Sequence, residues 1–210
     1  MKFWLFDILS CPICKKYPLK LFIFSYENDE KDFDRILEYY HNDQEMGDLI
    51  QRELVIIEEI NEKIYIKDNI VIKETPGNKY LQKIIESIEE LNYVQDKSKL
   101  EISKELIDII KKQVKNKIQN FQRNKNKDKL SFNQILKELH LVNILKIELE
   151  INEGLLYCDK CQRWFPIIST IPQLLPDEYR EKEKDKEFFQ TNKNLLDEKF
   201  LKQDLKPYDF

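Results

Sequence analysis

The chain has 210 residues, of which 41% are hydrophobic and 35% are charged, so apolar residues suffice for a core beneath a strongly ionic surface. This length allows one domain with an insertion or two small domains. Residues 1–10 do not have the basic start and small-residue cleavage site typical of a secretory signal, and no apolar run approaches the roughly 18 residues that span a bilayer. The net charge of −4 does not by itself indicate a nucleic-acid binder. We therefore expect a soluble cytoplasmic protein without membrane contact.

A pair of cysteines introduces the first predicted elements. Cys11 and Cys14 form a Cys-x-x-Cys motif near the N-terminus. The apolar run that follows, residues 19–24, predicts a β-strand. Apolar residues at broadly helical spacing then predict a helix over residues 32–53.

The middle of the chain is predicted to be mainly helical, with one hairpin. Two β-branched runs, residues 54–60 and 64–72, flank a short polar segment and predict a β-hairpin. Apolar stripes at helical spacing follow at residues 80–91 and 106–121 and predict two amphipathic helices.

Three shorter elements are predicted in the remainder. Residues 131–139 predict a short helix with Ser131 as its N-cap. The alternating residues 144–151 predict a strand that leads into the second cysteine motif. Residues 177–210 begin with a highly charged stretch and then return to apolar residues at helical spacing. They predict a helical tail that packs on the inserted domain or docks on a partner.

The second cysteine pair indicates a metal site. Cys158 and Cys161 form another Cys-x-x-Cys motif, 144 positions after Cys14. Four thiols in two such motifs are typical of a tetrahedral Zn²⁺ site, because two intervening residues let one tight turn present both sulfurs to one ion. Four protein ligands leave no position for water, so this zinc is expected to be structural. The alternatives are a redox dithiol, for which neither pair has the usual βαβ setting, and unrelated buried cysteines.

The two pairs lie at opposite ends of the chain, whereas an ordinary zinc ribbon separates them by about 15–20 residues. We therefore predict an α+β fold whose small zinc ribbon is formed by the N- and C-terminal parts, residues 1–26 and 150–176. A mostly helical inserted domain with a hairpin spans residues 27–149, and the helical tail spans residues 177–210. A folded insert with adjacent ends adds little to the entropy of closing so long a loop.

The segments around both cysteine pairs resemble one known family. The first reads Asp7-Ile8-Leu9-Ser10-Cys11-Pro12-Ile13-Cys14, followed by Pro18-Leu19-Lys20-Leu21. The second reads Glu153-Gly154-Leu155-Leu156-Tyr157-Cys158-Asp159-Lys160-Cys161-Gln162-Arg163-Trp164-Phe165-Pro166-Ile167, followed by Ile171-Pro172-Gln173-Leu174-Leu175-Pro176. In order and spacing they resemble the zinc-ribbon activator subunit of tRNA and protein methyltransferases, the multifunctional methyltransferase subunit family.

The resemblance implies a non-catalytic subunit that binds class I S-adenosylmethionine (SAM)-dependent methyltransferases as a heterodimer, stabilises them and activates them. These enzymes modify tRNA, rRNA and translation factors, so the subunit reaches tRNA or a translation factor only through its partner, and only the partner binds SAM. The resemblance also implies that the ribbon adds a strand to the edge of the enzyme's sheet and covers an apolar patch there.

The predicted partner-binding residues belong to the C-terminal half of the ribbon, where many apolar groups occur in a unit too small to bury them all. They are Trp164, Phe165, Ile167, Ile171, Pro172, Leu174 and Leu175. For Phe165 and Ile167, the alternative is burial in the ribbon's own core against the insert.

A basic segment supports a second hypothesis. Between positions 111 and 129, eight basic residues accompany a single aspartate, so this segment carries +7 and the remainder of the chain −11. The candidate RNA contacts are Lys111, Lys112, Lys115, Arg123, Lys125 and Lys127. The alternative function is therefore a zinc-ribbon nucleic-acid-binding or transcription-associated module that uses this segment directly. A solvated helix surface is the simplest alternative to RNA contact.

No pattern in the sequence indicates catalysis, and we expect that the protein is not an enzyme. His41 and His140 are isolated from other potential ligands, and beside four thiols neither is expected to bind the metal. No Ser/His/Asp grouping, phosphate-binding loop or paired-carboxylate motif stands out.

Overall fold

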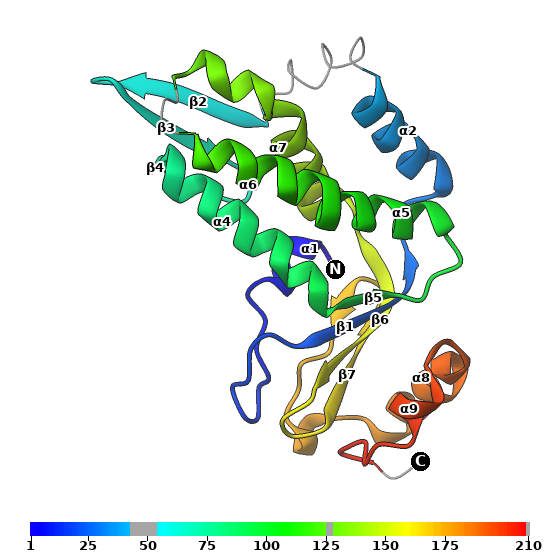
Figure 1. The fold of residues 1–210 in the computed structure, drawn as a ribbon. Helices are drawn as coiled ribbons and strands as arrows, with labels where there is room; N and C mark the ends of the chain where they lie inside the picture. Colours follow the sequence, from blue (N-terminus) through cyan, green and yellow to red (C-terminus); the bar gives the residue numbers. More distant parts are fainter. Residues whose placement is uncertain (43–53, 125–127, 209–210) are drawn as a thin grey trace. The chain divides into compact units, whose positions relative to one another are not determined.

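The computed structural model describes residues 1–42, 54–124 and 128–208 (Figure 1). The chain divides into two compact units. The first comprises Met1–Glu27, Tyr93–Glu101 and Glu150–Phe210, and the second comprises Asn28–Asn92 and Ile102–Leu149. The second unit is therefore inserted into the first, which assembles residues from both ends of the chain.

A β-sheet forms the centre of the first unit. β1 (Lys20–Tyr26) pairs antiparallel with β6 (Ile151–Cys158) and parallel with β5 (Val94–Asp96). β6, β7 (Arg163–Ile168) and β8 (Ile171–Pro172) form an antiparallel meander. β1 confirms the strand predicted at residues 19–24. The short β5 was not predicted, because three residues carry too little pattern and its partner lies far away in the sequence. The order of the strands in this sheet is β5, β1, β6, β7 and β8.

Short helices accompany this sheet. α1 (Phe3–Phe6) opens the chain, and α8 (Lys182–Asn192) and α9 (Glu198–Leu201) confirm the predicted helical tail. The apolar side chains of the tail pack on the sheet, whereas the sequence predicted docking on the insert or on a partner. The cluster that they form with the sheet contains Phe22, Phe24, Leu155, Tyr157, Trp164, Phe188, Phe189, Leu196, Phe200 and Leu205.

The second unit contains the predicted hairpin. β2 (Val55–Ile60) and β3 (Lys63–Asp68) pair antiparallel, and the two residues between them have positive φ angles of 49° and 62°. Two consecutive positive φ angles are typical of the type I′ turn, which matches the twist of the flanking strands. β3 ends at Asp68 rather than at residue 72, because the Asp68 carboxylate accepts a hydrogen bond of 2.8 Å from the N–H of Ile70 and turns the chain. β4 (Thr75–Pro76) then pairs with β3.

α2 (Glu30–His41) begins the helical part of the second unit. Its N-terminus has a capping box, in which the side chains of Asp29 and Asp32 each accept a hydrogen bond from the other residue's backbone N–H. The helix predicted over residues 32–53 is confirmed as far as His41. The remainder of that prediction, residues 43–53, lies outside the described residues.

Further helices form the core of the second unit. They confirm both predicted apolar stripes, and Leu81, Ile84 and Ile118 on these stripes are fully buried. A π-helical segment, Ile110–Val114, joins the two helices of the second stripe. In the described part of the chain, no helix combines the length and apolar character needed to cross a membrane. The helices are α4 (Gly77–Glu89), α5 (Glu101–Ile109), α6 (Lys115–Arg123) and α7 (Leu136–Asn143).

The prediction of a strand at residues 144–151 is wrong. Ile144–Glu148 continues from α7 as a π-helical segment, and β6 begins only at Ile151. Ile144, Leu145 and Lys146 are all buried. Because consecutive side chains are buried together, their alternation of residue types does not reflect one buried and one exposed face.

The predicted N-cap at Ser131 is also wrong. Ser131 lies in a 3₁₀ turn, Leu130–Gln134, where its hydroxyl donates a hydrogen bond of 2.7 Å to the Asp128 carbonyl. α7 begins after this turn, at Leu136, without a side-chain cap. The serine therefore stabilises the turn before the helix. Serine hydroxyls favour turns as well as helix N-caps, because in both they can bond to nearby backbone groups.

Candidate metal centre

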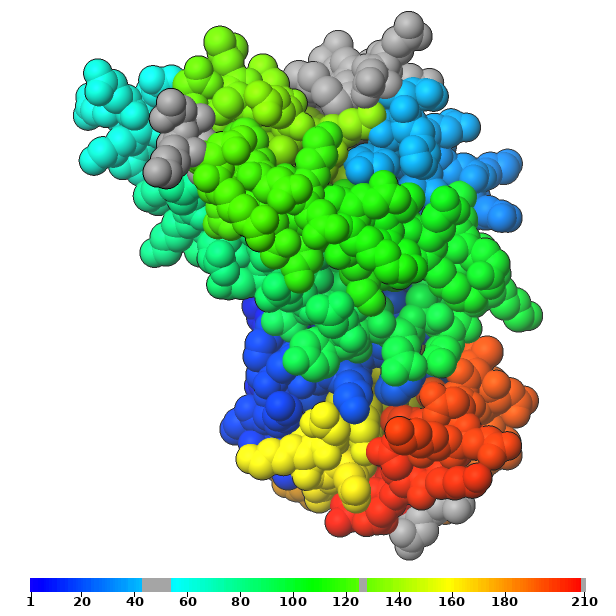
Figure 2. Space-filling model, in the orientation of Figure 1, coloured from blue at the N-terminus to red at the C-terminus, as the bar shows by residue number. Residues whose placement is uncertain are grey.

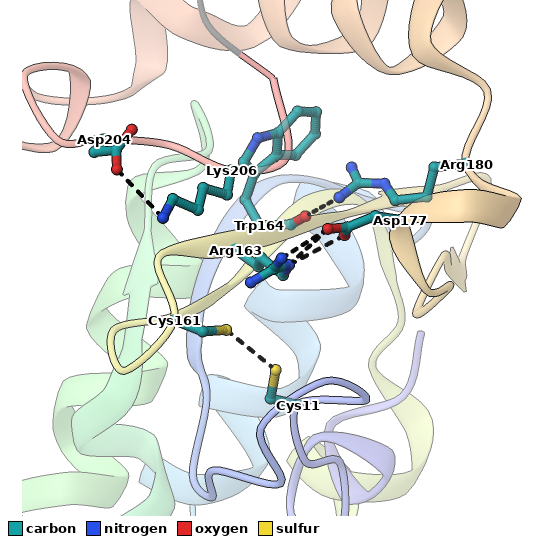
Figure 3. Close-up of polar contacts among 8 residues, drawn as sticks. All are labelled: Cys11, Cys161, Arg163, Trp164, Asp177, Arg180, Asp204 and Lys206. Atoms are coloured by element: carbon teal, nitrogen blue, oxygen red, sulfur yellow. Dashed lines mark hydrogen bonds and ion pairs between the residues drawn. The ribbon is translucent and has the colours of Figure 1, made fainter.

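Four cysteine thiols come together in the first unit. Cys11 and Cys14 lie in the loop between α1 and β1, Cys158 ends β6, and Cys161 lies in the turn before β7. The Sγ atoms all lie within 4.8 Å of one another. The Sγ atoms of Cys11 and Cys161 are 3.5 Å apart (Figure 3), and those of Cys14 and Cys158 are 3.4 Å apart. The predicted α+β fold, with a cysteine cluster built from both ends of the chain around a helical insert, is confirmed.

The spacing of these sulfurs fits a tetrahedral metal ion. An ion bonded to four sulfurs at about 2.3 Å holds them about 3.8 Å apart, within the range that the four thiols span. All four cysteines are free thiols. Among the described residues, these four cysteines form the one group of three or more potential metal ligands whose ligand atoms lie close together. His41 and His140 are not part of this group. The four cysteines are therefore positioned to bind a metal ion.

Both cysteine pairs are shaped by the same backbone conformation. The residue directly after the second cysteine has a positive φ in each, 58° at Lys15 and 57° at Gln162. In the first pair, the N–H of Lys15 donates to the Cys11 carbonyl, and the N–H of Cys11 donates to the Lys16 carbonyl. This left-handed residue reverses the chain after each motif, so that both sulfurs of a pair face the same point.

Without a cation, the four thiols cannot all ionise easily. Burial raises the pKa of Cys158 and of Cys11. Burial also opposes ionisation of Cys14, but the N–H of Lys16 and the neighbouring thiols outweigh it and lower the pKa of Cys14 to about 7. Because only thiolates bind a metal strongly, an ion that enters the site must displace the remaining protons.

An ion pair lies next to the metal ligands, on the first residue of β7. Arg163 Nε donates to both carboxylate oxygens of Asp177, at 3.1 and 2.9 Å, and Arg163 Nη2 donates at 2.8 Å (Figure 3). These bonds, together with the Cys161 thiol, raise the pKa of Arg163 above its ordinary value despite partial burial. Asp177 is not among the residues that the sequence predicts for the site, because an aspartate in a run of charged residues carries no local signal of a distant partner.

The predicted partner-binding residues fall into two groups. Trp164, Phe165 and Ile167 on β7 are fully buried within the first unit. Ile171 and Leu175 are 59% and 40% exposed, respectively. Pro172 and Leu174, beside them, are half-buried. The exposed members therefore lie on and just after β8, at the edge of the sheet.

The predicted RNA contacts carry less free charge than the sequence suggests. Lys112 Nζ lies 2.7 Å from the Asp108 carboxylate, and Lys115 Nζ lies 2.9 Å from that of Glu89. Lys111 and Arg123 are in the helical part of the second unit. Two further candidates, Lys125 and Lys127, lie outside the described residues.

A sheet that brings two cysteine pairs to one metal site, with a helical domain inserted between them, defines a discontinuous ribbon-type metal-binding protein. A sequence model of the family described as Trm112p-like protein matches residues 2–168, which include all four cysteines. The chain belongs to this family, a family of non-catalytic methyltransferase activator subunits. No curated protein and no solved structure matches the chain.

Proposed function

We propose that the protein binds class I SAM-dependent methyltransferases that modify tRNA, rRNA and translation factors, as the stabilising and activating subunit of a heterodimer. The observation that carries this proposal is the match to the activator family over residues 2–168, together with four cysteines in metal-binding geometry. SAM is then bound by the partner alone, and tRNA or a translation factor is reached through the partner.

The metal in this proposal is a structural Zn²⁺ ion. Four sulfur ligands, one of the sets typical of structural zinc sites, are supplied by Cys11, Cys14, Cys158 and Cys161. With every position filled by protein, the ion has no place for a reacting water. Its contribution is to hold the loop before β1 against the turn between β6 and β7.

The partner-binding surface in this proposal is the β8 edge of the sheet. β8 is a two-residue edge strand, and Ile171 and Leu175 expose apolar surface there. Strand addition at a sheet edge supplies main-chain hydrogen bonds, while exposed apolar side chains supply specificity. The ribbon portion, residues 1–26 and 150–176, provides this edge, and the inserted domain (27–149) and tail (177–210) are additions to it.

Co-expression with candidate methyltransferases tests the proposal. The chain is expected to co-purify with a class I methyltransferase in one-to-one ratio and to raise both its soluble yield and its activity. A double variant, Ile171→Asp and Leu175→Asp, is expected to lower the affinity for that enzyme at least tenfold while the four cysteines retain their metal. Ile72→Asp is the matched control, because Ile72 is 79% exposed in the second unit.

Two results would contradict the proposal. Unchanged affinity of the double variant would exclude the β8 edge as the binding surface. Recovery of RNA without any methyltransferase, with affinity that falls steeply as salt rises, would instead favour the nucleic-acid-binding module.

A further inference from the structure

β8 pairs with Ile167 and Ile168 at the end of β7, and the outward edge at the start of β7 is occupied by the protein's own C-terminal segment. The N–H of Trp164 donates to the Lys206 carbonyl at 3.3 Å, and the N–H of Lys206 donates to the Gln162 carbonyl at 2.9 Å. Arg180 Nη1 donates to the Trp164 carbonyl at 2.8 Å (Figure 3). Main-chain groups that an edge strand ordinarily leaves open are therefore satisfied within the chain.

The same segment covers one face of the sheet. The ring centroids of Phe188 and Phe24 are 6.2 Å apart, and those of Phe200 and Phe22 are 4.8 Å apart. The tail residues, orange to red in Figure 2, form a continuous surface of the first unit. We call residues 177–208 the strap, because they run along both the face and the edge of the sheet.

A buried arginine fixes the strap near its start. The side chain of Arg180 is only 2% exposed, and its Nε lies 2.7 Å from the Asp185 carboxylate. Its guanidinium carbon lies 4.7 Å from the centre of the Trp164 ring. A charged group so well buried needs its partners in place, so the strap is held in one defined position.

The strap is attached to residues that directly follow a metal ligand. Gln162, Arg163 and Trp164, which bind the strap, come immediately after Cys161. Asp177 of the strap holds the Arg163 guanidinium through three hydrogen bonds of 2.8–3.1 Å. Because this short segment directly follows Cys161, an ion bound to Cys161 and a docked strap would both hold the same residues.

We propose that docking of the strap and metal binding at the four cysteines are thermodynamically coupled, with Arg163 as the positioning residue that joins them. The coupling is reciprocal: a bound metal tightens the strap, and a docked strap raises the affinity for the metal by the same factor. Loss of the metal then uncovers both the edge of β7 and the aromatic face of the sheet. The strap lies beyond the part of the chain that the family model matches. The proposal requires metal binding but no methyltransferase, so it can fail while the proposed function stands.

The test releases the strap at a distance from the cysteines in the full-length, Zn²⁺-loaded protein. Phe188→Asp removes the contact with Phe24, at the end of β1 remote from the cysteines. Hydrogen exchange of α8 is expected to rise while β1 stays protected, and Zn²⁺ affinity, measured by competition with a chromogenic chelator, is expected to fall at least about fivefold. Glu198→Ala is the matched control, because it removes an exposed ion pair with Lys202 and leaves the strap docked.

The reciprocal measurement uses the unmodified chain. Chelation is expected to raise exchange of α8 at least about fivefold, and Zn²⁺ is expected to restore protection. Unchanged exchange of α8 after chelation would overturn the proposal. Unchanged Zn²⁺ affinity in Phe188→Asp, with α8 exchanging faster, would overturn it equally.

A spectroscopic measurement separates Arg163 from a general effect on stability. In the Co²⁺-loaded protein, Arg163→Ala is expected to shift the thiolate-to-cobalt absorption band, because the guanidinium beside Cys161 is lost. Arg163→Lys keeps the positive charge without the bidentate guanidinium, so it is expected to bind Zn²⁺ more tightly than Arg163→Ala and less tightly than the unmodified chain. An unchanged band in Arg163→Ala would remove Arg163 from the coupling.

Discussion

The four cysteines differ in how readily they ionise, although they are expected to act as one ligand set. Cys14 has a pKa lowered to about 7, whereas burial raises the pKa of Cys158. Cys14 is therefore more available to an incoming ion than Cys158 or Cys11, and the ion must displace protons from those two buried thiols. The free energy of metal binding includes this proton release, so affinity is expected to rise with pH.

Replacing one of these ligands tests the site directly. Cys14→Ala is expected to lower Zn²⁺ affinity by more than the roughly 10- to 100-fold that loss of an outer partner causes at metal sites. Ser10→Ala is the matched control, because Ser10 is an exposed residue just before Cys11. Metal content after dialysis against a competing chelator measures both variants. Retention of one equivalent of zinc by Cys14→Ala would exclude the four-thiolate site.

His140 provides a prediction about pH in the second unit. Its side chain is 2% exposed, its Nδ1 makes no hydrogen bond in the described part of the chain, and burial lowers its pKa. The unfolded chain therefore binds a proton here more readily than the folded chain. Protonation of His140 therefore lowers the free energy of unfolding as the pH falls below the ordinary histidine pKa of about 6.5, by at most about 1.4 kcal/mol per pH unit. Well above that pH, His140 makes no pH-dependent contribution.

Urea unfolding between pH 7 and pH 5, followed by circular dichroism, measures this contribution. His140→Gln is expected to show a shallower loss of stability with falling pH than the unmodified chain. His41→Gln, at an exposed histidine in the same unit, should keep the original slope. Equal slopes in all three proteins would mean that protonation of His140 does not contribute.

At the scale of elements, the sequence predicts what is periodic and local. The strand at β1, the hairpin of β2 and β3, and the stripe of α4 follow from patterns within a few residues. Residues 144–151 were misassigned because they are buried on several sides, which removes the one-sided pattern on which the prediction depends. The spacing of the cysteine motifs predicts the four thiols that the fold brings together in metal-binding geometry, whereas Asp177 and Lys206 acquire their contacts only through long-range packing.

The pairing of β1 with β6 depends on a glycine. A Cβ at Gly154 would lie 2.7 Å from the Phe22 carbonyl oxygen, which belongs to the backbone of the neighbouring strand. Gly154→Ala is therefore expected to push the strands apart and to destabilise the first unit by about 1–3 kcal/mol. At Gly77, the nearest atom is 3.1 Å away at the tip of the Phe132 ring, so a Cβ there requires a much smaller adjustment than at Gly154. The gain in helix propensity offsets that contact, so Gly77→Ala is expected to change stability little.

Urea unfolding followed by the fluorescence of the buried Trp164 reports on the first unit. A lower midpoint for Gly154→Ala, with an unchanged midpoint for Gly77→Ala, is the expected outcome. Equal midpoints would show that the β1–β6 pair tolerates a methyl group at this position.

At the scale of the whole molecule, the two units differ in what holds them together. The first unit joins distant parts of the chain, and its cysteine site lies where the loop before β1 meets the turn after β6. The second unit has a continuous apolar core on α4, α6 and α7, which includes the fully buried Leu81, Ile84 and Ile118. A metal that joins two distant segments contributes to folding in proportion to its binding free energy. That contribution belongs to the first unit.

Removal of the metal is therefore expected to act unequally along the chain. After chelation of the Zn²⁺-loaded protein, hydrogen exchange should rise in β1, β6 and the strap, while α4 and α7 keep their protection. Re-addition of Zn²⁺ should restore protection in the first unit, because the ligands remain in the chain and only their organisation is lost. A simultaneous rise in α4 and α7 would show that both units unfold as one cooperative body. The metal would then stabilise the insert as well as the ribbon.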